Sequence, residues 1–132
     1  MSRPREVLVL LDVAIEGATG LALIAIPNFV ARVLLGAELP DIGVVTARVA
    51  GIALLALVLG AWLGRHARGG VSTLAALLAY NALITVYLGW LGLAGVFVGP
   101  LLWPVVAVHA VVTALLGFTL WQSRHRCYPA SV

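Results

Sequence analysis

Four long apolar runs occupy most of this chain and decide the solvent in which it can fold. They cover roughly residues 7–26, 43–63, 72–94 and 101–121. Each is close to the ~20 residues that an α-helix needs to span ~30 Å of hydrocarbon. With 63% hydrophobic and only 10% charged residues, a water-soluble domain of this length could not bury so much apolar surface. The sequence therefore predicts a transmembrane protein.

Three short connectors separate the runs, and each is rich in residues that end helices. They read GAELPDIG (36–43), GRHARGG (64–70) and GVFVGP (95–100), and such Gly and Pro clusters mark turns. None is long enough to hold a soluble domain. We therefore expect one all-α domain over residues 1–132, an integral membrane antiparallel four-helix bundle. A tryptophan lies within about one helical turn of each of four span ends, as an aromatic belt requires: Trp62, Trp90, Trp103 and Trp121.

The segment after Pro27 departs from a plain four-span pattern. PNFVARVLLG (27–36) continues with helical periodicity and leaves Arg32 off its apolar face. The residues on that face are Phe29, Val30, Val33 and Leu34. We predict a short amphipathic helix over 28–35 that lies on the outer membrane interface. A kinked extension of the first span is the alternative.

The arginines predict the orientation of the chain. All basic residues other than histidine are arginines, and six of them lie at the N-terminus, in the second connector and in the C-terminal tail: Arg3, Arg5, Arg65, Arg68, Arg124 and Arg126. In a four-span protein these three segments face the same side, and the positive-inside rule makes that side cytoplasmic. We expect a multi-pass protein of the bacterial inner (cytoplasmic) membrane with both termini in the cytoplasm.

The charge balance also bears on partners. The net charge of +3 and pI near 9.8 fit the topology and attraction to anionic headgroups. The charge is divided between termini and one connector, so we expect no nucleic-acid partner. The expected partners are the lipid bilayer and, because four short helices enclose little volume, further copies in a homo-oligomer or a larger membrane complex. The lone Cys127 excludes an intramolecular disulfide and is interpreted as incidental.

Polar residues inside the spans are the candidates for function. An ionisable group at mid-membrane costs ~2.5–3.5 kcal/mol on insertion scales, so each needs a partner or a purpose. The ionisable candidates are Asp12, Glu16, Arg48 and His109, and the strongest neutral one is Asn81. At ~1.5 Å per residue, Glu16, Asn81 and His109 fall near the midplane, ~12–14 Å from the ends of their spans.

The helical faces group these residues further. Asp12 lies one turn from Glu16 on a stripe that continues to Thr19 and Gly20. Asn81 shares a face with Thr85, and His109 shares one with Thr113. If the stripes converge, the bundle interior holds a carboxylate, an amide, an imidazole and hydroxyls at one level. Such a cluster would relay protons, bind a polar headgroup, or only form hydrogen bonds among its own members.

Arg48 and Tyr87 are expected closer to the outer surface of the membrane than the midplane residues. Side chains lean toward the N-terminus of their helix, which aims Arg48 outward and away from Glu16. Tyr87, at a similar outer depth, or Glu38 and Asp41 in the first connector are easier partners for this guanidinium. The alternative is that Arg48 extends to the outer headgroups.

Structural interpretations compete with the functional ones. Asn81, Thr85 and Thr113 are residues of the kind that hydrogen-bond between transmembrane helices. Tyr80 and Tyr87 are interpreted as packing or belt residues. A stripe of small residues on the second span indicates a close helix contact, within the chain or between subunits. Its members are Thr46, Ala50, Ala53, Gly60 and Gly64.

Enzyme signatures are absent from the sequence. It contains no Walker loop and no G-x-S-x-G, H-E-x-x-H or C-x-x-C motif. Glu16 and His109 are the only acid–base pair in the spans, and no second histidine lies where it could bind the same metal ion. We expect no catalytic residues, no cofactor and no metal, and a role other than an enzyme.

Segments in all four spans resemble uncharacterised small bacterial four-span membrane proteins that are DoxX-like in general plan. The resemblance is carried by ATGLALIAIPNFVARVLLG (18–36), ARVAGIALLALVLGAW (47–62), AYNALITVYLGWLG (79–92) and GPLLWPVVAVHAVVTALL (99–116). It implies a single four-helix domain, and the DoxX association with a thiosulfate:quinone oxidoreductase implies a respiratory accessory role. It implies no cofactor-binding residue here.

The sequence leads to two functional hypotheses. The first is a non-enzymatic accessory or ligand-binding subunit, whose polar interior holds a lipid, a quinone head or a small polar group. The candidate ligand- or proton-binding residues are Glu16, Asn81, His109, Arg48, Asp12 and Tyr87. The alternative is a proton-coupled small-molecule transporter that acts as a homo-oligomer through Glu16.

Overall fold

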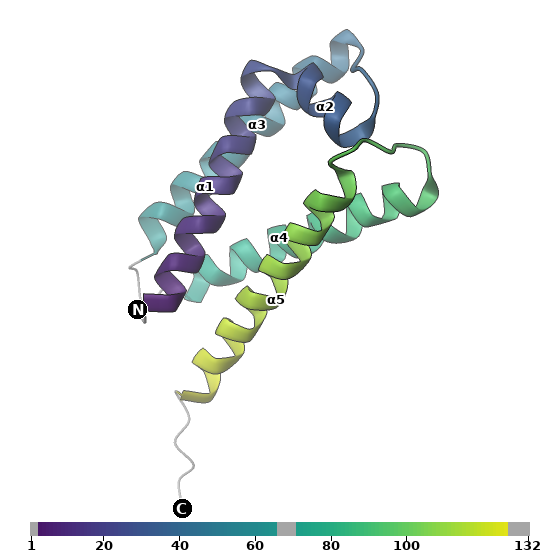
Figure 1. Cartoon of the computed structure of the whole chain (residues 1–132). Coiled ribbons are helices and arrows are strands. Elements are labelled where there is room, and N and C mark those ends of the chain that lie inside the picture. The colour runs from purple at the N-terminus through teal and green to yellow at the C-terminus, as the bar shows by residue number, and fades with distance from the viewer. Residues whose placement is uncertain (1–2, 66–70, 127–132) are drawn as a thin grey trace, which may run out of the picture.

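The computed structural model describes the backbone of residues 3–65 and 71–126 and the side chains of residues 5–65 and 71–123. Throughout these ranges the regular structure is helical. The helices are α1 (Arg3–Ala25), α2 (Pro27–Leu35), α3 (Asp41–Gly64), α4 (Val71–Ala94) and α5 (Leu102–Arg126). Figure 1 shows α1 beside α3 and α4 crossing α5. The expectations for Arg68 and Cys127 fall outside the described residues.

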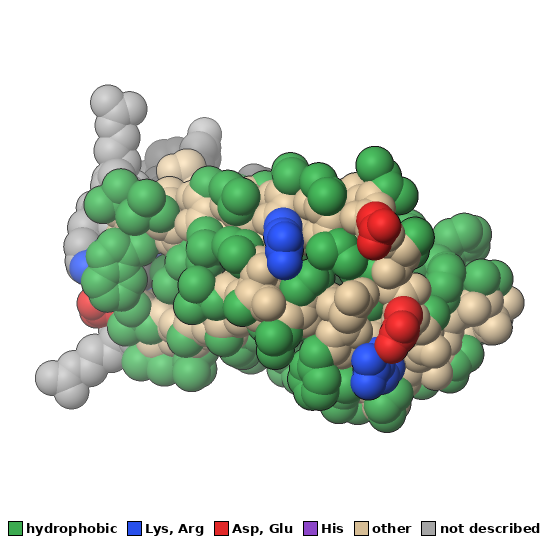
Figure 2. All heavy atoms as spheres, turned by 90° about the horizontal axis from the view of Figure 1, so that it is seen from above, with side chains coloured by type: hydrophobic (Ala, Val, Ile, Leu, Met, Phe, Trp, Pro, Cys, Tyr) green, Lys and Arg blue, Asp and Glu red, His purple; other side chains and the backbone are tan. Residues whose placement is uncertain are grey.

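Four of these helices, α1, α3, α4 and α5, are long and apolar enough to cross a membrane. The prediction of an all-α chain with four long apolar helices is confirmed. Large apolar side chains are exposed along all four, among them Leu21, Leu63, Leu83 and Phe118. In Figure 2 apolar side chains cover most of the visible face, and few charged ones interrupt them. Such a surface indicates a multi-pass membrane protein.

Pro27 separates the short helix α2 from α1. Proline is favoured at the first position of a helix, where its missing N–H costs nothing. The helix ends at Gly36, whose φ of 75° lies in the left-handed region and whose N–H donates to the Arg32 carbonyl at 3.0 Å. This is a glycine cap of the αL type. The chain therefore has a separate short helix here and not an extension of α1.

One face of α2 packs against the rest of the chain. Pro27 and Ala31 are buried there, whereas Phe29, which the sequence placed on the apolar face, is 57% exposed. The reason is that α2 folds back over the end of α4 and α5. There Leu34 and Leu35 contact a cluster of buried leucines, Leu88, Leu91 and Leu102.

A backbone contact fastens α2 to the connector between α4 and α5. The Leu101 N–H donates to the Val33 carbonyl at 2.8 Å. Gly99 makes this approach feasible, because a Cβ there would lie 2.4 Å from the carbonyl carbon of Leu34. The connector and α2 therefore form one cap over this end of the molecule.

The α1–α3 pair is held by a close crossing of two glycines. A Cβ on Gly51 would lie 2.6 Å from the carbonyl oxygen of Gly20, so the two backbones are in direct contact. Close approach through small residues is a common device of membrane helices. The crossing brings α1 and α3 together as one pair, while α4 packs mainly on α5.

Most of the predicted small-residue stripe of α3 lies on the exposed surface. Four of its members, Thr46, Ala50, Ala53 and Gly60, are exposed. Gly64 alone among them meets another helix closely, since a Cβ there would lie 2.6 Å from Thr73 Oγ1 of α4. Inside this chain the close contact with α1 is made by Gly51 and the stripe contributes Gly64 toward α4, while a contact of the stripe between subunits stays a prediction.

A larger apolar cluster joins all four long helices. It consists of Val9 of α1, Ala61 of α3, Leu74 and Leu77 of α4, and Leu116 and Leu120 of α5. The leucine cluster beneath α2 lies further along α4 and α5, so a section of these two helices separates the two apolar clusters. The polar residues of the spans lie at that level.

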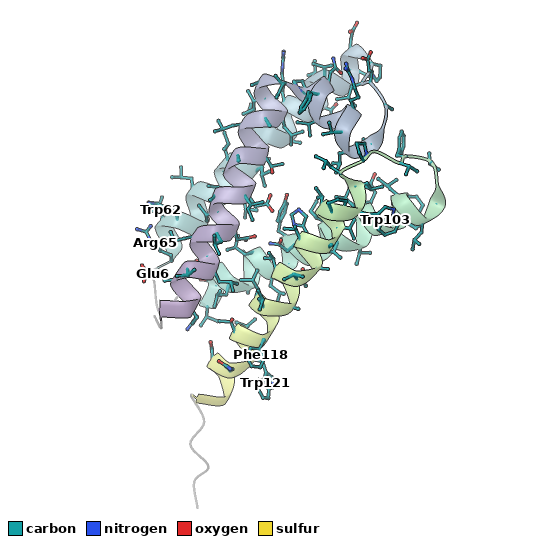
Figure 3. All side chains as sticks on the ribbon, viewed as in Figure 1. Glu6, Trp62, Arg65, Trp103, Phe118 and Trp121 are labelled. Atoms are coloured by element: carbon teal, nitrogen blue, oxygen red, sulfur yellow. The ribbon has the colours of Figure 1, made fainter. Side chains whose placement is uncertain are left out.

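The tryptophans predicted as a belt are all exposed: Trp62, Trp90, Trp103 and Trp121. Figure 3 shows Trp62 and Arg65 close to Glu6, near the start of α1 and the end of α3. The Arg65 guanidinium lies 3.6 Å from the Trp62 ring centroid. Trp103 and Trp121 lie toward opposite ends of α5. Exposed indole rings near helix ends fit the headgroup level of a bilayer.

A candidate polar centre between α1, α4 and α5

Four polar side chains from three helices meet at the level between the two apolar clusters. Asp12 and Glu16 come from α1, Asn81 from α4 and His109 from α5. Their exposed fractions are 2%, 1%, 0% and 8% in that order. The neighbouring spans turn apolar side chains outward while these polar ones lie inside. We call these residues, together with Tyr80, the polar centre.

Asn81 connects the other members through both ends of its amide. Its Nδ2 donates to Asp12 Oδ1 at 3.1 Å and to the Leu77 carbonyl at 2.9 Å. Its Oδ1 lies 2.8 Å from His109 Nδ1. Both neighbours of Nδ2 are acceptors, so the amide has only one orientation that satisfies them. Asn81 therefore ties α1, α4 and α5 together.

The orientation of Asn81 also determines the tautomer of His109. An amide oxygen accepts hydrogen bonds only, so the imidazole must carry a hydrogen on Nδ1 to make the 2.8 Å contact. The Tyr80 ring stands edge-on to this imidazole at 75°, with ring centroids 6.3 Å apart. Nε2 is then the ring nitrogen whose protonation can change.

The carboxyl group of Glu16 has a hydrogen-bond partner at only one of its two oxygens among the described residues. The Tyr80 hydroxyl donates to Oε2 at 3.0 Å. Oε1 is buried and has no hydrogen-bond partner among the described residues. His109 Nδ1 lies 3.5 Å from Oε1, within reach of electrostatic attraction, but its hydrogen points to the nearer oxygen of Asn81. A buried acceptor left unpaired costs roughly 1–3 kcal/mol, so this oxygen is the unusual feature of the centre.

Tyr80 was not predicted as a member of the centre. The sequence indicated a packing or belt residue, but its hydroxyl binds Glu16. A usable signal existed, because Tyr80 sits beside Asn81 near the middle of its span, where a phenol needs a hydrogen-bond partner. Tyr87, which was predicted as a candidate, is 57% exposed and lies against Trp90 at 6.3 Å between ring centroids.

Arg48 also lies apart from the centre. Its side chain is on the exposed surface of α3. Of the partners proposed for it, Glu38 instead pairs with Arg32 at 2.7 Å, and both of those side chains are largely exposed. The structure therefore brings together four of the six predicted site residues and leaves Arg48 and Tyr87 outside.

The threonines beside the centre do not bond between helices as predicted. The Thr85 hydroxyl donates to the Asn81 carbonyl at 2.8 Å, and the Thr113 hydroxyl donates to the His109 carbonyl at 2.7 Å. Each bond stays within one helix, because a threonine hydroxyl reaches the carbonyl four residues earlier. Asn81 alone of the three predicted residues bonds across helices.

The donor set limits the chemistry of this centre. Within the described residues, no three His, Cys, Asp or Glu side chains are arranged to hold a metal ion. Glu16 and His109 lie close together, with Oε1 3.5 Å from Nδ1, but the Nδ1 hydrogen is bound to Asn81. Comparisons with family models, with curated proteins and with solved structures found no match to this chain.

Proposed function

We propose that this chain is a bacterial inner-membrane protein whose four long helices form an antiparallel bundle with both termini in the cytoplasm. The four apolar helices support it, as do the exposed tryptophans near the helix ends. The arginines at the termini and in the second connector supply the orientation. A DoxX-like relationship remains a prediction from the sequence.

Within that frame we infer a non-enzymatic, ligand-binding subunit. The observation that carries the inference is Oε1 of Glu16, which is buried and unpartnered in an otherwise bonded network. Most buried polar groups in folded proteins have a hydrogen-bond partner, so an unpartnered carboxyl oxygen supports a site for a bound group. The polar centre is therefore proposed to complete its bonding with a small ligand.

The second candidate function is a proton-coupled transporter that acts as a homo-oligomer. The closeness of two titratable groups favours it, since His109 Nδ1 lies 3.5 Å from Glu16 Oε1 and such groups inside a membrane mark proton pathways. Asp12, one turn from Glu16, adds a second carboxyl group to the same network. A transporter additionally requires a water path from Glu16 to one side of the membrane.

Infrared spectroscopy of the purified protein in lipid nanodiscs tests the proposal. Carboxyl bands that disappear in Glu16→Gln are assigned to Glu16, and Glu38→Gln serves as the control because Glu38 is exposed and outside the centre. We expect the Glu16 bands to respond to added ligand or to pH. Glu16 bands that stay constant in wild type under all conditions, together with a Glu16→Gln variant that only folds less well, would show that the centre only joins helices.

A further inference from the structure

The polar centre has more acceptors than hydrogens to fill them. Asn81 gives its two Nδ2 hydrogens to Asp12 and to the Leu77 carbonyl. Tyr80 gives its single hydroxyl hydrogen to Glu16 Oε2. The carboxyl oxygens thus receive side-chain hydrogens from two donors, and Oε1 of Glu16 receives none from the described residues.

Rearranging the existing groups does not remove this surplus. Turning the Asn81 amide around would point its oxygen at Asp12 and the Leu77 carbonyl, which are acceptors. Moving the His109 hydrogen to Nε2 would leave two acceptors facing each other, Nδ1 and Asn81 Oδ1, at 2.8 Å. The missing hydrogen therefore does not come from Asn81, Tyr80 or His109, and its remaining sources are a proton on a carboxyl group or a bound donor.

We propose that the polar centre binds a small ammonium-type cation whose N–H groups donate to Glu16 Oε1 and to the carboxyl group of Asp12. This inference rests on the proposed ligand-binding function and names the class of ligand. Two buried carboxyl groups one helical turn apart favour positive charge, and an anion or a quinone carbonyl would add a further acceptor.

The surroundings of Glu16 favour an N–H cation over a bare ion. A proton on Oε1 is the alternative source of the missing hydrogen, and the test below, made at constant pH, distinguishes it from an ammonium ligand. Among the described residues, no three His, Cys, Asp or Glu side chains are placed to hold a metal ion.

A groove lies between α3 and the start of α4, lined by residues outside the polar centre. It has a volume of about 420 Å³ and lies between α3, from Ala56 to Gly64, and the first turns of α4, including Ser72 and Ala76. Residues four apart share a helix face, so the next side chain on the Ser72–Ala76 stripe is Tyr80. The groove thus lies one helical turn from the hydroxyl that binds Glu16.

Methylammonium chloride is the probe for the test, with the full-length protein in lipid nanodiscs at constant pH and ionic strength. Difference infrared spectra are recorded for wild type, Glu16→Gln, Asp12→Asn and the control Glu38→Gln. We expect methylammonium to shift the Glu16 bands saturably in wild type and in the control, where sodium chloride at the same concentration does not. The shift should vanish in Glu16→Gln and weaken in Asp12→Asn.

The outcomes distinguish a failure of the ammonium assignment from a failure of the proposed ligand-binding function. An equal response to sodium chloride, or a response to pH alone, would overturn the ammonium assignment and leave a cation or proton site in place. A response to neutral hydroquinone without one to methylammonium would overturn it and retain ligand binding. No response to any probe, in variants whose circular dichroism shows that they remain folded, would overturn both.

Discussion

Oδ1 of Asn81 lies 2.8 Å from Nδ1 of His109, and this one contact orders the whole polar centre. It requires a hydrogen on Nδ1, and that hydrogen is then directed away from Glu16 Oε1. Asn81 can hold this orientation because its Nδ2 is committed to Asp12 and to the Leu77 carbonyl. The stability of the fold and the availability of Glu16 are therefore linked through a single amide.

Replacing Asn81 with alanine should destabilise the protein by about 1–3 kcal/mol, because it leaves buried groups on Asp12 and His109 without partners. Unfolding in mixed micelles measures the free energy of unfolding. The matched control is Thr85→Ala, which removes only a bond to a carbonyl of its own helix and should cost less than about 0.5 kcal/mol. Equal losses in the two variants would contradict the bridging role of Asn81.

The tautomer of His109 gives a second prediction. The amide nitrogen of asparagine takes a position near Nδ1 of histidine, whereas that of glutamine falls near Nε2. His109→Asn should therefore keep the donor to Asn81 and be more stable than His109→Gln by about 1 kcal/mol. The same unfolding assay compares the two, and nitrogen-15 spectra of the wild-type imidazole read the tautomer directly. A protonated Nε2 with a bare Nδ1 would overturn the assignment.

The sequence was sufficient to predict the long helices and most of the centre. Apolar runs of membrane length leave little choice of secondary structure, and Pro27 and Gly36 delimit α2. Asp12, Glu16, Asn81 and His109 were identified because charged or amide groups in such runs are costly, and depth counted from the span ends placed three of them at one level.

The contacts of individual side chains depend on which helix faces pack together, and hydrophobic periodicity does not determine which faces those are. Tyr80 and Tyr87 are seven residues apart and share nearly the same face of α4, yet at their different heights one binds Glu16 and the other is exposed. The small-residue stripe of α3 was equally compatible with contact or exposure, and Gly51 made the contact instead. The fold of α2 over the α4–α5 connector turned Phe29 outward, which a hydrophobic pattern alone could not show.

The glycine crossing of α1 and α3 predicts a position-specific effect on one helix. Gly51→Ala should destabilise the protein by about 1–3 kcal/mol, because its methyl group would lie 2.6 Å from the Gly20 carbonyl oxygen and force the helices apart. At Gly60 a Cβ meets nothing within 4 Å, so Gly60→Ala should be neutral or stabilising by up to about 1 kcal/mol. Chemical unfolding of both variants checks the contrast, which a similar effect at the two sites would refute.

The cap formed by α2 depends in the same way on Gly99. Gly99→Ala should loosen α2, because its methyl group would overlap the Leu34 backbone and break the Leu101 to Val33 bond. Hydrogen exchange of α2 amides should then accelerate. Gly89→Ala is the control, since a Cβ there makes an ordinary contact with Val106 at 3.9 Å. Unchanged exchange in Gly99→Ala would show that the cap tolerates displacement of the connector.

The groove between α3 and α4 provides the last prediction, which concerns access to Glu16. Gly60 lines the groove and has open space above it, so Gly60→Phe can fill the groove without displacing a neighbouring helix. If the ligand enters there, Gly60→Phe should slow the response of the Glu16 infrared bands to methylammonium several-fold and leave its final amplitude unchanged. Gly60→Ala, which adds a single carbon, should respond at the wild-type rate. An unaltered rate in the phenylalanine variant would mean that the ligand reaches the centre by another path, while a lost amplitude would mean that Gly60 supports the centre itself. The rate and the amplitude therefore report separately on the path and on the site.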